Sequence, residues 1–225
     1  MGVFCLLLSG ACGAMEFRLV GTTLVMSGLV VSDDLARLKD SLATGKVRLV
    51  VLHESPGGDL WNGLKLGEWI RDARLPTAVS GKCESACGLI YLGGVTRSFT
   101  DARPVDRTMV GLHGAHHRET KEVLTQQSYQ IERFMRTMMD GKYPADLLER
   151  TLYPKNPGDF VYVFHPRRFA EGKRQGVMQC QLQPDAKFKC VMLEAMDALS
   201  VGVVTNPEIL QLEPELRQSL AGGQP

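Results

Sequence analysis

Short apolar segments rich in β-branched residues alternate along the chain with segments in which apolar residues recur every three or four positions. Residues 47–53 form the most continuous apolar run, which is typical of a strand buried on both faces of a parallel sheet. Comparable segments predict strands at residues 16–20, 23–26, 77–79, 108–113 and 160–164. The alternation of strands and helices predicts an α/β fold with right-handed βαβ crossovers and a mainly parallel sheet.

Polar and glycine residues directly follow three of these predicted strands. The sequence Ser-Pro-Gly-Gly at 55–58 follows the strand at 47–53, and Ser85 opens an apolar helix after the strand at 77–79. His113 ends the strand at 108–113. Because the carboxyl ends of parallel strands meet at one edge of a sheet, we expect these three features to lie together.

Ser85 is the candidate nucleophile, because a hydroxyl at the start of a helix lies near free backbone N–H groups that stabilise an oxyanion. A serine hydroxyl needs a base near neutral pH, and imidazole is the usual one. His113 directly follows an apolar strand, whereas His116 and His117 lie in a polar segment. We therefore expect His113 to be the base. The plain alternative is that Ser85 only begins a helix.

Three motifs in this order resemble the ClpP-like serine peptidases of the ClpP/crotonase superfamily, particularly their exported bacterial relatives. They are Ser-Pro-Gly-Gly at 55–58, Gly-x-Cys-x-Ser-Ala-Cys at 81–87 and Val-Gly-Leu-His at 110–113. The similarity covers about residues 24–177. It implies a ClpP/crotonase-like fold of repeated ββα and βα units with a long projecting helix at residues 119–140.

The resemblance also implies roles for individual residues. Ser85 would attack a peptide carbonyl and His113 would act as the general base. The N–H groups of Gly57 or Gly58 and of Ala86 would hold the oxyanion. The activity implied is peptide-bond hydrolysis through an acyl-enzyme.

A third member of the site is implied by the same resemblance, because ClpP-like enzymes place an aspartate after the long helix and just before a short strand. Asp159 stands in that place, ahead of the strand at 160–164. The match needs a small gap. Asp140, Asp146 or the absence of a third member therefore stay open.

Other functions stay open as well. A crotonase-type enzyme would use the oxyanion hole for acyl-CoA thioesters but would usually lack the Ser-His pair. A binding or scaffold protein would keep the fold without activity, and Cys83 or Cys87 could replace Ser85 as the nucleophile. Labelling by a fluorophosphonate separates these alternatives.

Composition and length narrow the partners. The 225 residues carry 26 Lys and Arg against 25 Asp and Glu, a net charge of +1, so nothing favours nucleic-acid binding. We expect no metal and no cofactor, and peptides or unfolded proteins as substrates. We also expect a homo-oligomer formed through the helix at 119–140, whose second half is crowded with phenylalanine, isoleucine and methionine residues. The alternative is that residues 167–199 fold back over this face and leave a monomer.

Residues 1–14 are apolar and small and resemble a secretory signal peptide, although no Lys or Arg precedes the apolar run. A buried strand or a start further upstream are the alternatives. Export to the periplasm or beyond is the expectation, without an ATP-dependent unfoldase partner. The predicted organisation is then a peptidase domain at 15–177, a C-terminal addition at 178–205 and a polar tail at 206–225.

Four cysteines remain after such a leader, an even number that suits an oxidising compartment. Cys180 and Cys190 bracket a polar segment with turn residues, so we expect a disulfide bond between them. Cys83 and Cys87 would be paired around Ser85 or left as thiols. A zinc site built from all four is the rival interpretation, but no Cys-x-x-Cys pair is present.

Overall fold

The computed structural model describes residues 14–117, 120, 122–154, 156 and 158–222. The predicted leader, except Ala14, lies outside the described residues. Within them ten strands form one sheet: β1 (Glu16–Val20), β2 (Thr23–Val30), β3 (Leu49–Gly58), β4 (Thr77–Glu84), β5 (Arg97–Thr100), β6 (Met109–Leu112), β7 (Phe160–Phe164), β8 (Val177–Leu182), β9 (Phe188–Met192) and β10 (Ile209–Leu210). Every strand predicted from the sequence is present, and several extend further.

The strand order along the sheet is β1-β2-β3-β4-β6-β7-β8-β9, with β5 beside β4 and β10 beside β5. The centre, from β2 through β3 and β4 to β6, is parallel. Strand β1 and the strands from β7 to β9 pair antiparallel. The predicted mainly parallel α/β sheet is therefore confirmed at its centre, and an antiparallel extension follows β6.

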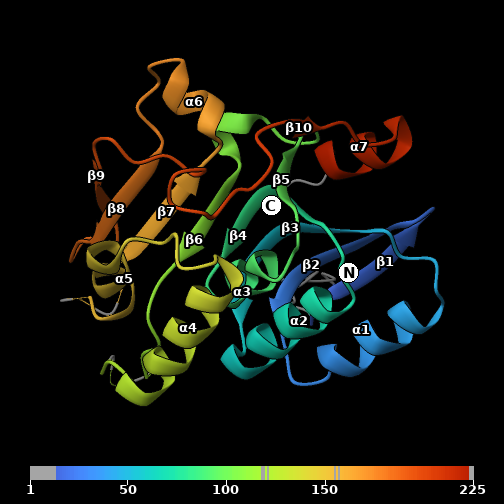
Figure 1. Cartoon of the computed structure of the whole chain (residues 1–225), viewed down its shortest axis with the longest axis horizontal. Helices are drawn as coiled ribbons and strands as arrows, with labels where there is room; N and C mark the ends of the chain where they lie inside the picture. Colours follow the sequence, from blue (N-terminus) through green and yellow to red (C-terminus); the bar gives the residue numbers. More distant parts are fainter. Residues whose placement is uncertain (1–13, 118–119, 121, 155, 157, 223–225) are drawn as a thin grey trace, which may run out of the picture.

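Helices cover both faces of the sheet (Figure 1). They are α1 (Asp34–Ala43), α2 (Leu60–Asp72), α3 (Ala86–Leu92), α4 (Thr125–Met138), α5 (Ala145–Leu152), α6 (Pro166–Ala170) and α7 (Pro214–Ala221), with a 3-10 turn at Val105–Arg107. In the main core, the five helices from α1 through α5 pack on one face of the sheet. On the other face, leucines of α7 and residue 212 pack against Val25, Val51 and Ala78. The predicted tail thus carries a packed strand and helix.

Glycines let the helices beside the active edge approach one another closely. A Cβ atom on Gly63 would lie 2.8 Å from the Cβ of Ala86, and one on Gly67 would lie 2.7 Å from the ring of Phe134. Because these contacts are shorter than van der Waals distance, α2 can reach α3 and α4 only with glycine at both positions. This packing fixes the start of α3.

The predicted long helix at 119–140 is shorter in the structure and does not project. Helix α4 begins at Thr125 and ends at Met138. Its apolar residues Phe134 and Met135 are 7 % and 0 % exposed and belong to the main core, as do Ile131 and Met138. The face predicted to bury itself in a neighbouring subunit is therefore covered within the chain, so the reason for expecting oligomerisation through it was wrong.

A buried arginine joins the C-terminal segment to this core. The guanidinium group of Arg97, 2 % exposed, donates to the carbonyls of Gly202 and Val203 at 2.8 and 2.9 Å. It also donates to Gly94 and Met138, near the ends of α3 and α4. The C-terminal ends of these helices carry partial negative charge, which suits a cation. Burial lowers the pKa of Arg97 to about 10.

Candidate active site

Ser85 lies in the sharp turn between β4 and α3. Its φ is +57° and its ψ is −125°, a backbone conformation that residues with a side chain rarely adopt. The N–H of Ser85 donates to the carbonyl of Gly111 in β6 at 2.9 Å, which holds the turn against the sheet. A strained strand-to-helix turn of this kind exposes a serine hydroxyl at the edge of a sheet.

Gly57 makes room for this turn. Its φ is +84°, and a Cβ on it would lie 2.6 Å from the Cβ of Ser85 and 2.7 Å from the nitrogen of Ala86. The Ser-Pro-Gly-Gly segment is therefore pressed directly against the serine turn. The N–H of Gly57 points to the hydroxyl of Ser55 at 3.3 Å. Gly58 and Ala86 line the cavity in front of Ser85.

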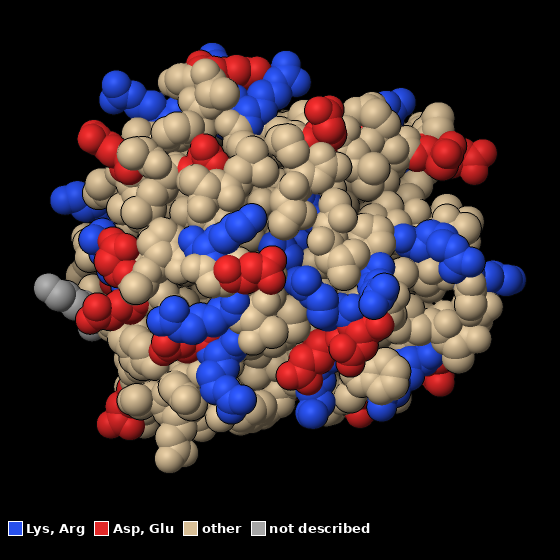
Figure 2. All heavy atoms as spheres, viewed as in Figure 1, with Lys and Arg blue, Asp and Glu red and all other residues tan. Residues whose placement is uncertain are grey.

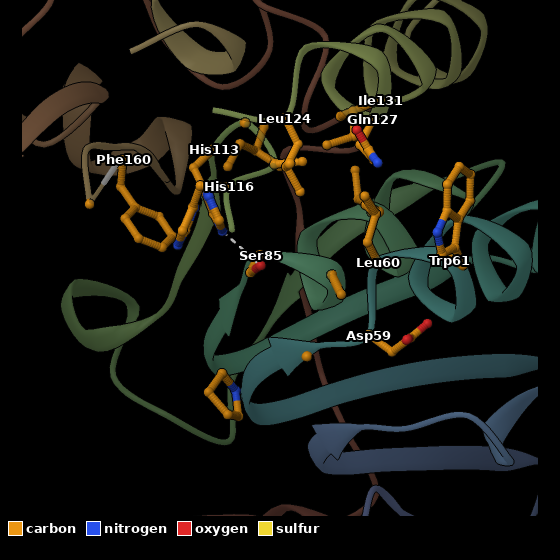
Figure 3. A pocket seen from close by; sticks show the side chains of 18 of the residues that line it. Asp59, Leu60, Trp61, Ser85, His113, His116, Leu124, Gln127, Ile131 and Phe160 are labelled. Carbon is orange, nitrogen blue, oxygen red and sulfur yellow. Dashed lines mark hydrogen bonds between the residues drawn. The ribbon is translucent and has the colours of Figure 1, made fainter. Parts of the chain in front are cut away.

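His113 reaches Ser85 from the next strand. In the parallel pairing of β4 with β6, Glu84 lies opposite Gly111. Ser85 and His113, which follow these two strands, therefore lie side by side. The Nε2 atom of His113 lies 2.7 Å from the Oγ of Ser85 (Figure 3). At this distance a neutral imidazole that is protonated on Nδ1 accepts the hydrogen bond of the hydroxyl. The sequence prediction that these two residues lie together is met.

Burial keeps His113 in the neutral, basic form. Removal from water lowers the pKa of His113 to about 4, and the nearby charge of His116 acts in the same direction. The backbone of Gly114 raises the pKa of His113, but by less than burial lowers it. The rings of His113 and His116 have centroids 5.3 Å apart. At neutral pH the His113 imidazole is therefore uncharged and able to accept a proton.

Asp159 does not take the place that the resemblance implied. Its carboxylate accepts from the N–H of Leu182 at 3.2 Å and from Asn156 at 3.5 Å, and it is 3 % exposed. The Nδ1 atom of His113 has no hydrogen-bond partner among the described residues. Among the described residues, the expected contact between Asp159 and His113 is therefore not formed, because the Asp159 side chain points toward β8.

An aromatic residue lies beside the imidazole instead. The ring centroid of Phe160 is 4.4 Å from that of His113. Phe160 in turn stacks on Tyr162 at 5.2 Å, and the Tyr162 hydroxyl donates to Glu84, the residue before Ser85, at 2.9 Å. Neighbouring residues of an extended chain point to opposite sides, so placing Phe160 at His113 turns Asp159 away. Phe160 was not among the predicted site residues, although it directly follows Asp159 in the sequence.

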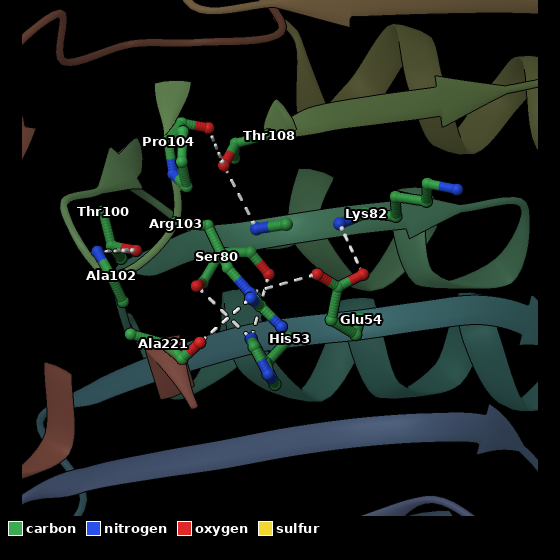
Figure 4. Close-up of polar contacts among 11 residues, drawn as sticks. His53, Glu54, Ser80, Lys82, Thr100, Ala102, Arg103, Pro104, Thr108 and Ala221 are labelled. Carbon is green, nitrogen blue, oxygen red and sulfur yellow. Dashed lines mark hydrogen bonds and ion pairs between the residues drawn. The ribbon is translucent and has the colours of Figure 1, made fainter. Parts of the chain in front are cut away.

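The other histidines make different contacts. His116 lines the same cavity, whereas His165 is buried next to Phe99. His53 contacts a second serine, with Nδ1 3.3 Å from the Oγ of Ser80 and 3.1 Å from its carbonyl oxygen (Figure 4). Ser80 is fully buried and does not line the cavity. This second serine–histidine contact is therefore structural, and it offers a matched control for the first.

The cavity in front of Ser85 has a volume of about 600 Å³. Phe160 lies on one side of Ser85, and Leu60 and Trp61 lie on the other (Figure 3). Further apolar lining comes from α3, α4 and the β8–β9 hairpin, and the described lining holds no lysine or arginine. Such a cavity suits an uncharged, apolar substrate portion at the hydroxyl.

The cysteines lie at disulfide distance in two separate pairs, Cys83 with Cys87 and Cys180 with Cys190. The expected pair Cys180–Cys190 is therefore present, and the zinc site built from all four is not. Cys83 and Cys87 are buried on either side of Ser85. Both pairs are compatible with an oxidising location.

Two further findings concern the described residues as a whole. None of their helices combines the length and apolar character that crossing a bilayer requires, and they contain no group of three or more His, Cys, Asp or Glu placed to hold a metal ion. On the face shown in Figure 2, basic and acidic side chains are interspersed. That face presents no extended region of one charge.

The fold and the site define an α/β protein with a serine–histidine pair at the edge of a largely parallel sheet. No family model matches the chain, and no curated protein matches it. Its fold is similar to solved structures that include proteases and enoyl-CoA hydratases.

Three of these structures illustrate the range. ClpP1 from Listeria monocytogenes is 11 % identical, with 87 % of this chain and 95 % of that chain covered and a TM-score of 0.47. A variant of a membrane-bound stomatin-specific protease is 11 % identical, with 84 % and 95 % covered and a TM-score of 0.46. An enoyl-CoA hydratase from Mycobacterium marinum is 12 % identical, with 93 % and 81 % covered and a TM-score of 0.45.

Proposed function

We propose that this protein is a serine hydrolase that cleaves peptide bonds with a Ser85–His113 dyad. The observation that carries the proposal is the 2.7 Å contact between Oγ and Nε2, made at a turn where φ is +57°. A serine in an ordinary helix cap has no need of that conformation or of a half-buried imidazole beside it.

The reaction has two halves. Ser85 attacks the substrate carbonyl while its proton passes to Nε2 of His113, and the imidazolium then gives this proton to the departing amine. Water next gives a proton to His113 and attacks the acyl-enzyme, and the proton returns to Ser85 as the acid leaves. The N–H groups of Gly58 and Ala86, which line the cavity, would hold the oxyanion in both halves.

His113 works without a carboxylate in this proposal. Packing against Phe160 fixes the ring plane, and burial keeps the imidazole neutral. The imidazolium formed during the reaction lacks an anionic partner, so a modest rate is expected compared with enzymes that carry a complete triad. Asp159 has no part in proton transfer.

The cavity favours a peptide over an acyl-CoA thioester. A coenzyme A substrate carries several phosphate charges, whereas the described lining holds no lysine or arginine and includes the carboxylate of Asp59. Peptide segments with apolar side chains fit the lining without requiring ion pairs. A crotonase-type activity and a non-catalytic scaffold remain the competing proposals.

The setting of the enzyme is proposed on other grounds. The two cysteine pairs fit an exported, periplasmic protein that acts on peptides or unfolded proteins without an ATP-dependent partner. A homo-oligomer is retained as a proposal, although its interface cannot be the apolar face of α4. The domain boundaries near residues 177 and 205 also stay proposals.

A fluorophosphonate probe tests the central claim. Wild type should be labelled, and labelling should disappear in Ser85→Ala and fall at least about a thousandfold in His113→Ala, because members of such a unit act together. Ser80→Ala is the matched control, since Ser80 also contacts a histidine but lies outside the cavity. Equal labelling of wild type and Ser85→Ala would refute the proposal.

A further inference from the structure

The hairpin formed by β8 and β9 provides one wall of the cavity. Leu182 and Phe188 are cross-strand partners next to its turn, and both line the cavity. They keep 39 % and 44 % of their surface exposed, a large fraction for apolar side chains that line the cavity in front of Ser85. Exposed apolar surface of this kind at a cavity marks a place where a ligand is contacted.

Three contacts fasten this hairpin. The pair Cys180–Cys190 lies two residues along the strands from the Leu182–Phe188 pair, on the same face of the hairpin. The carboxylate of Asp159 accepts from the N–H of Leu182 at 3.2 Å. The side chain of Leu182 also packs so closely on Gly158 that a Cβ there would overlap it.

The fastened wall reaches the catalytic pair through aromatic contacts. The ring of Phe188 meets the ring of Phe160 edge to face, with centroids 6.1 Å apart. Phe160 in turn contacts His113. Phe188 and Ser85 line the same cavity, so an apolar group of a substrate bound at Ser85 can extend to Phe188.

We propose that the β8–β9 hairpin sets the substrate preference of this site by selecting an uncharged, apolar group beside the scissile bond. Asp159 acts as a positioning residue that fastens the hairpin. The inference rests on the proposed hydrolase function and assigns Phe188 and Leu182 as its specificity-determining residues.

Two pairs of esters test the wall. p-Nitrophenyl acetate and hexanoate differ on the acyl side, whereas methyl and hexyl acetate differ on the leaving side. Wild type should prefer the longer member of at least one pair. Phe188→Ala should lower that preference about tenfold, which is the usual scale for an apolar contact in a pocket.

Val191→Ala is the matched control. Val191 is an apolar residue of the same strand and 59 % exposed, but it lies on the opposite face and does not line the cavity. It should leave the preference unchanged. Absence of a chain-length preference in wild type, or the same preference in wild type and Phe188→Ala for both ester pairs, would overturn the proposal.

The role of Asp159 is tested by comparing two substitutions. Asp159→Ala removes the acceptor for Leu182 and should weaken the chain-length preference while leaving the pH dependence of kcat/KM in place. Asp159→Asn keeps an acceptor oxygen and should restore most of that preference. A large loss of kcat in both variants, with no change in preference, would instead make Asp159 part of the catalytic unit.

Binding of N-phenyl-1-naphthylamine, an uncharged apolar fluorophore, separates failure of this inference from failure of the proposed function. If wild type is neither labelled nor active on esters, the hydrolase proposal fails. Weaker fluorophore binding by Phe188→Ala than by Val191→Ala would still support the hairpin as the apolar recognition wall. Equal binding by both would refute that wall as well.

Discussion

The imidazole of His113 and the ring of Phe160 lie against each other, with centroids 4.4 Å apart. Nδ1 of this imidazole has no hydrogen bond among the described residues, so apolar packing holds the ring that an acid would hold in a triad. The first prediction follows from this contact.

Phe160→Leu should lower kcat about tenfold with little change in KM, because a loosened imidazole spends less time in line with Ser85. Phe164→Leu is the matched control, since Phe164 is a buried phenylalanine on the same side of β7 that lines no part of the cavity. Steady-state kinetics on an ester substrate measures both. Equal effects of the two variants would mean that Phe160 contributes only to stability.

The half-buried imidazole of His113 should determine the pH dependence of activity. Because the pKa of His113 is lowered to about 4, kcat/KM should hold down to well below pH 6.5, the pKa of a free imidazole, and then fall. His116→Gln removes the neighbouring charge and should move this limb to higher pH. His117→Gln, at an exposed position outside the cavity, should not.

The lowered pKa of His113 should also make the free energy of unfolding depend on pH. Between pH 6.5 and about 4 the unfolded chain binds a proton at residue 113 that the folded chain excludes. The contribution of His113 to the free energy of unfolding is therefore full above pH 6.5 and decreases as the pH falls through this window. Urea unfolding of wild type and His113→Gln at pH 7 and pH 5 measures it, and an unchanged difference would contradict the buried neutral form.

Gly57→Ala should inactivate the protein. The new methyl group would meet the turn at Ser85 at 2.5 to 2.7 Å, in addition to the cost of a positive φ. We expect a loss of about 2 kcal/mol or more in stability and no labelling by the fluorophosphonate. Gly45→Ala shares the positive φ but meets nothing within 4 Å, so it should cost only about 1 to 2 kcal/mol and keep activity.

Loss of the Cys83–Cys87 pair should lower activity by more than its effect on stability explains. Each pair closes a short loop, worth roughly 2 to 3 kcal/mol, so the double serine variants of both pairs should lose similar amounts of stability. Only Cys83 and Cys87 bracket Ser85, and their replacement should lower kcat most. Thermal unfolding and labelling rates give the comparison, and parallel losses in both variants would assign the pair a purely structural role.

Oligomerisation should not depend on the buried side of α4. Phe134→Glu would place a charge among core residues and should unfold the chain rather than dissociate subunits. Tyr129, 53 % exposed on the same helix, gives a fair test of an α4 interface. Light scattering of wild type and Tyr129→Glu decides: a change of mass would restore α4 as an interface, and a monomeric wild type would end the oligomer proposal.

The local sequence determined a large part of the protein. Apolar runs located the strands, and β7 agrees with its predicted bounds at both ends. The order of strands and glycine turns placed Ser85, His113 and the Gly-Gly segment at one sheet edge, because parallel strands end together. The polar turn segment between Cys180 and Cys190 also predicted that these two cysteines pair, since a hairpin brings its two ends together.

Tertiary structure alone decided the rest. Whether Asp159 or Phe160 faces His113 depends on how β7 enters an antiparallel pairing with β6 and β8, which no local pattern reports. The apolar side of α4 looked like an interface because the sequence does not show that α2, α3 and the C-terminal segment cover it. The direction in which a side chain points and the covering of an apolar helix face both depend on contacts between distant segments. They are therefore determined only by the packing of the whole fold.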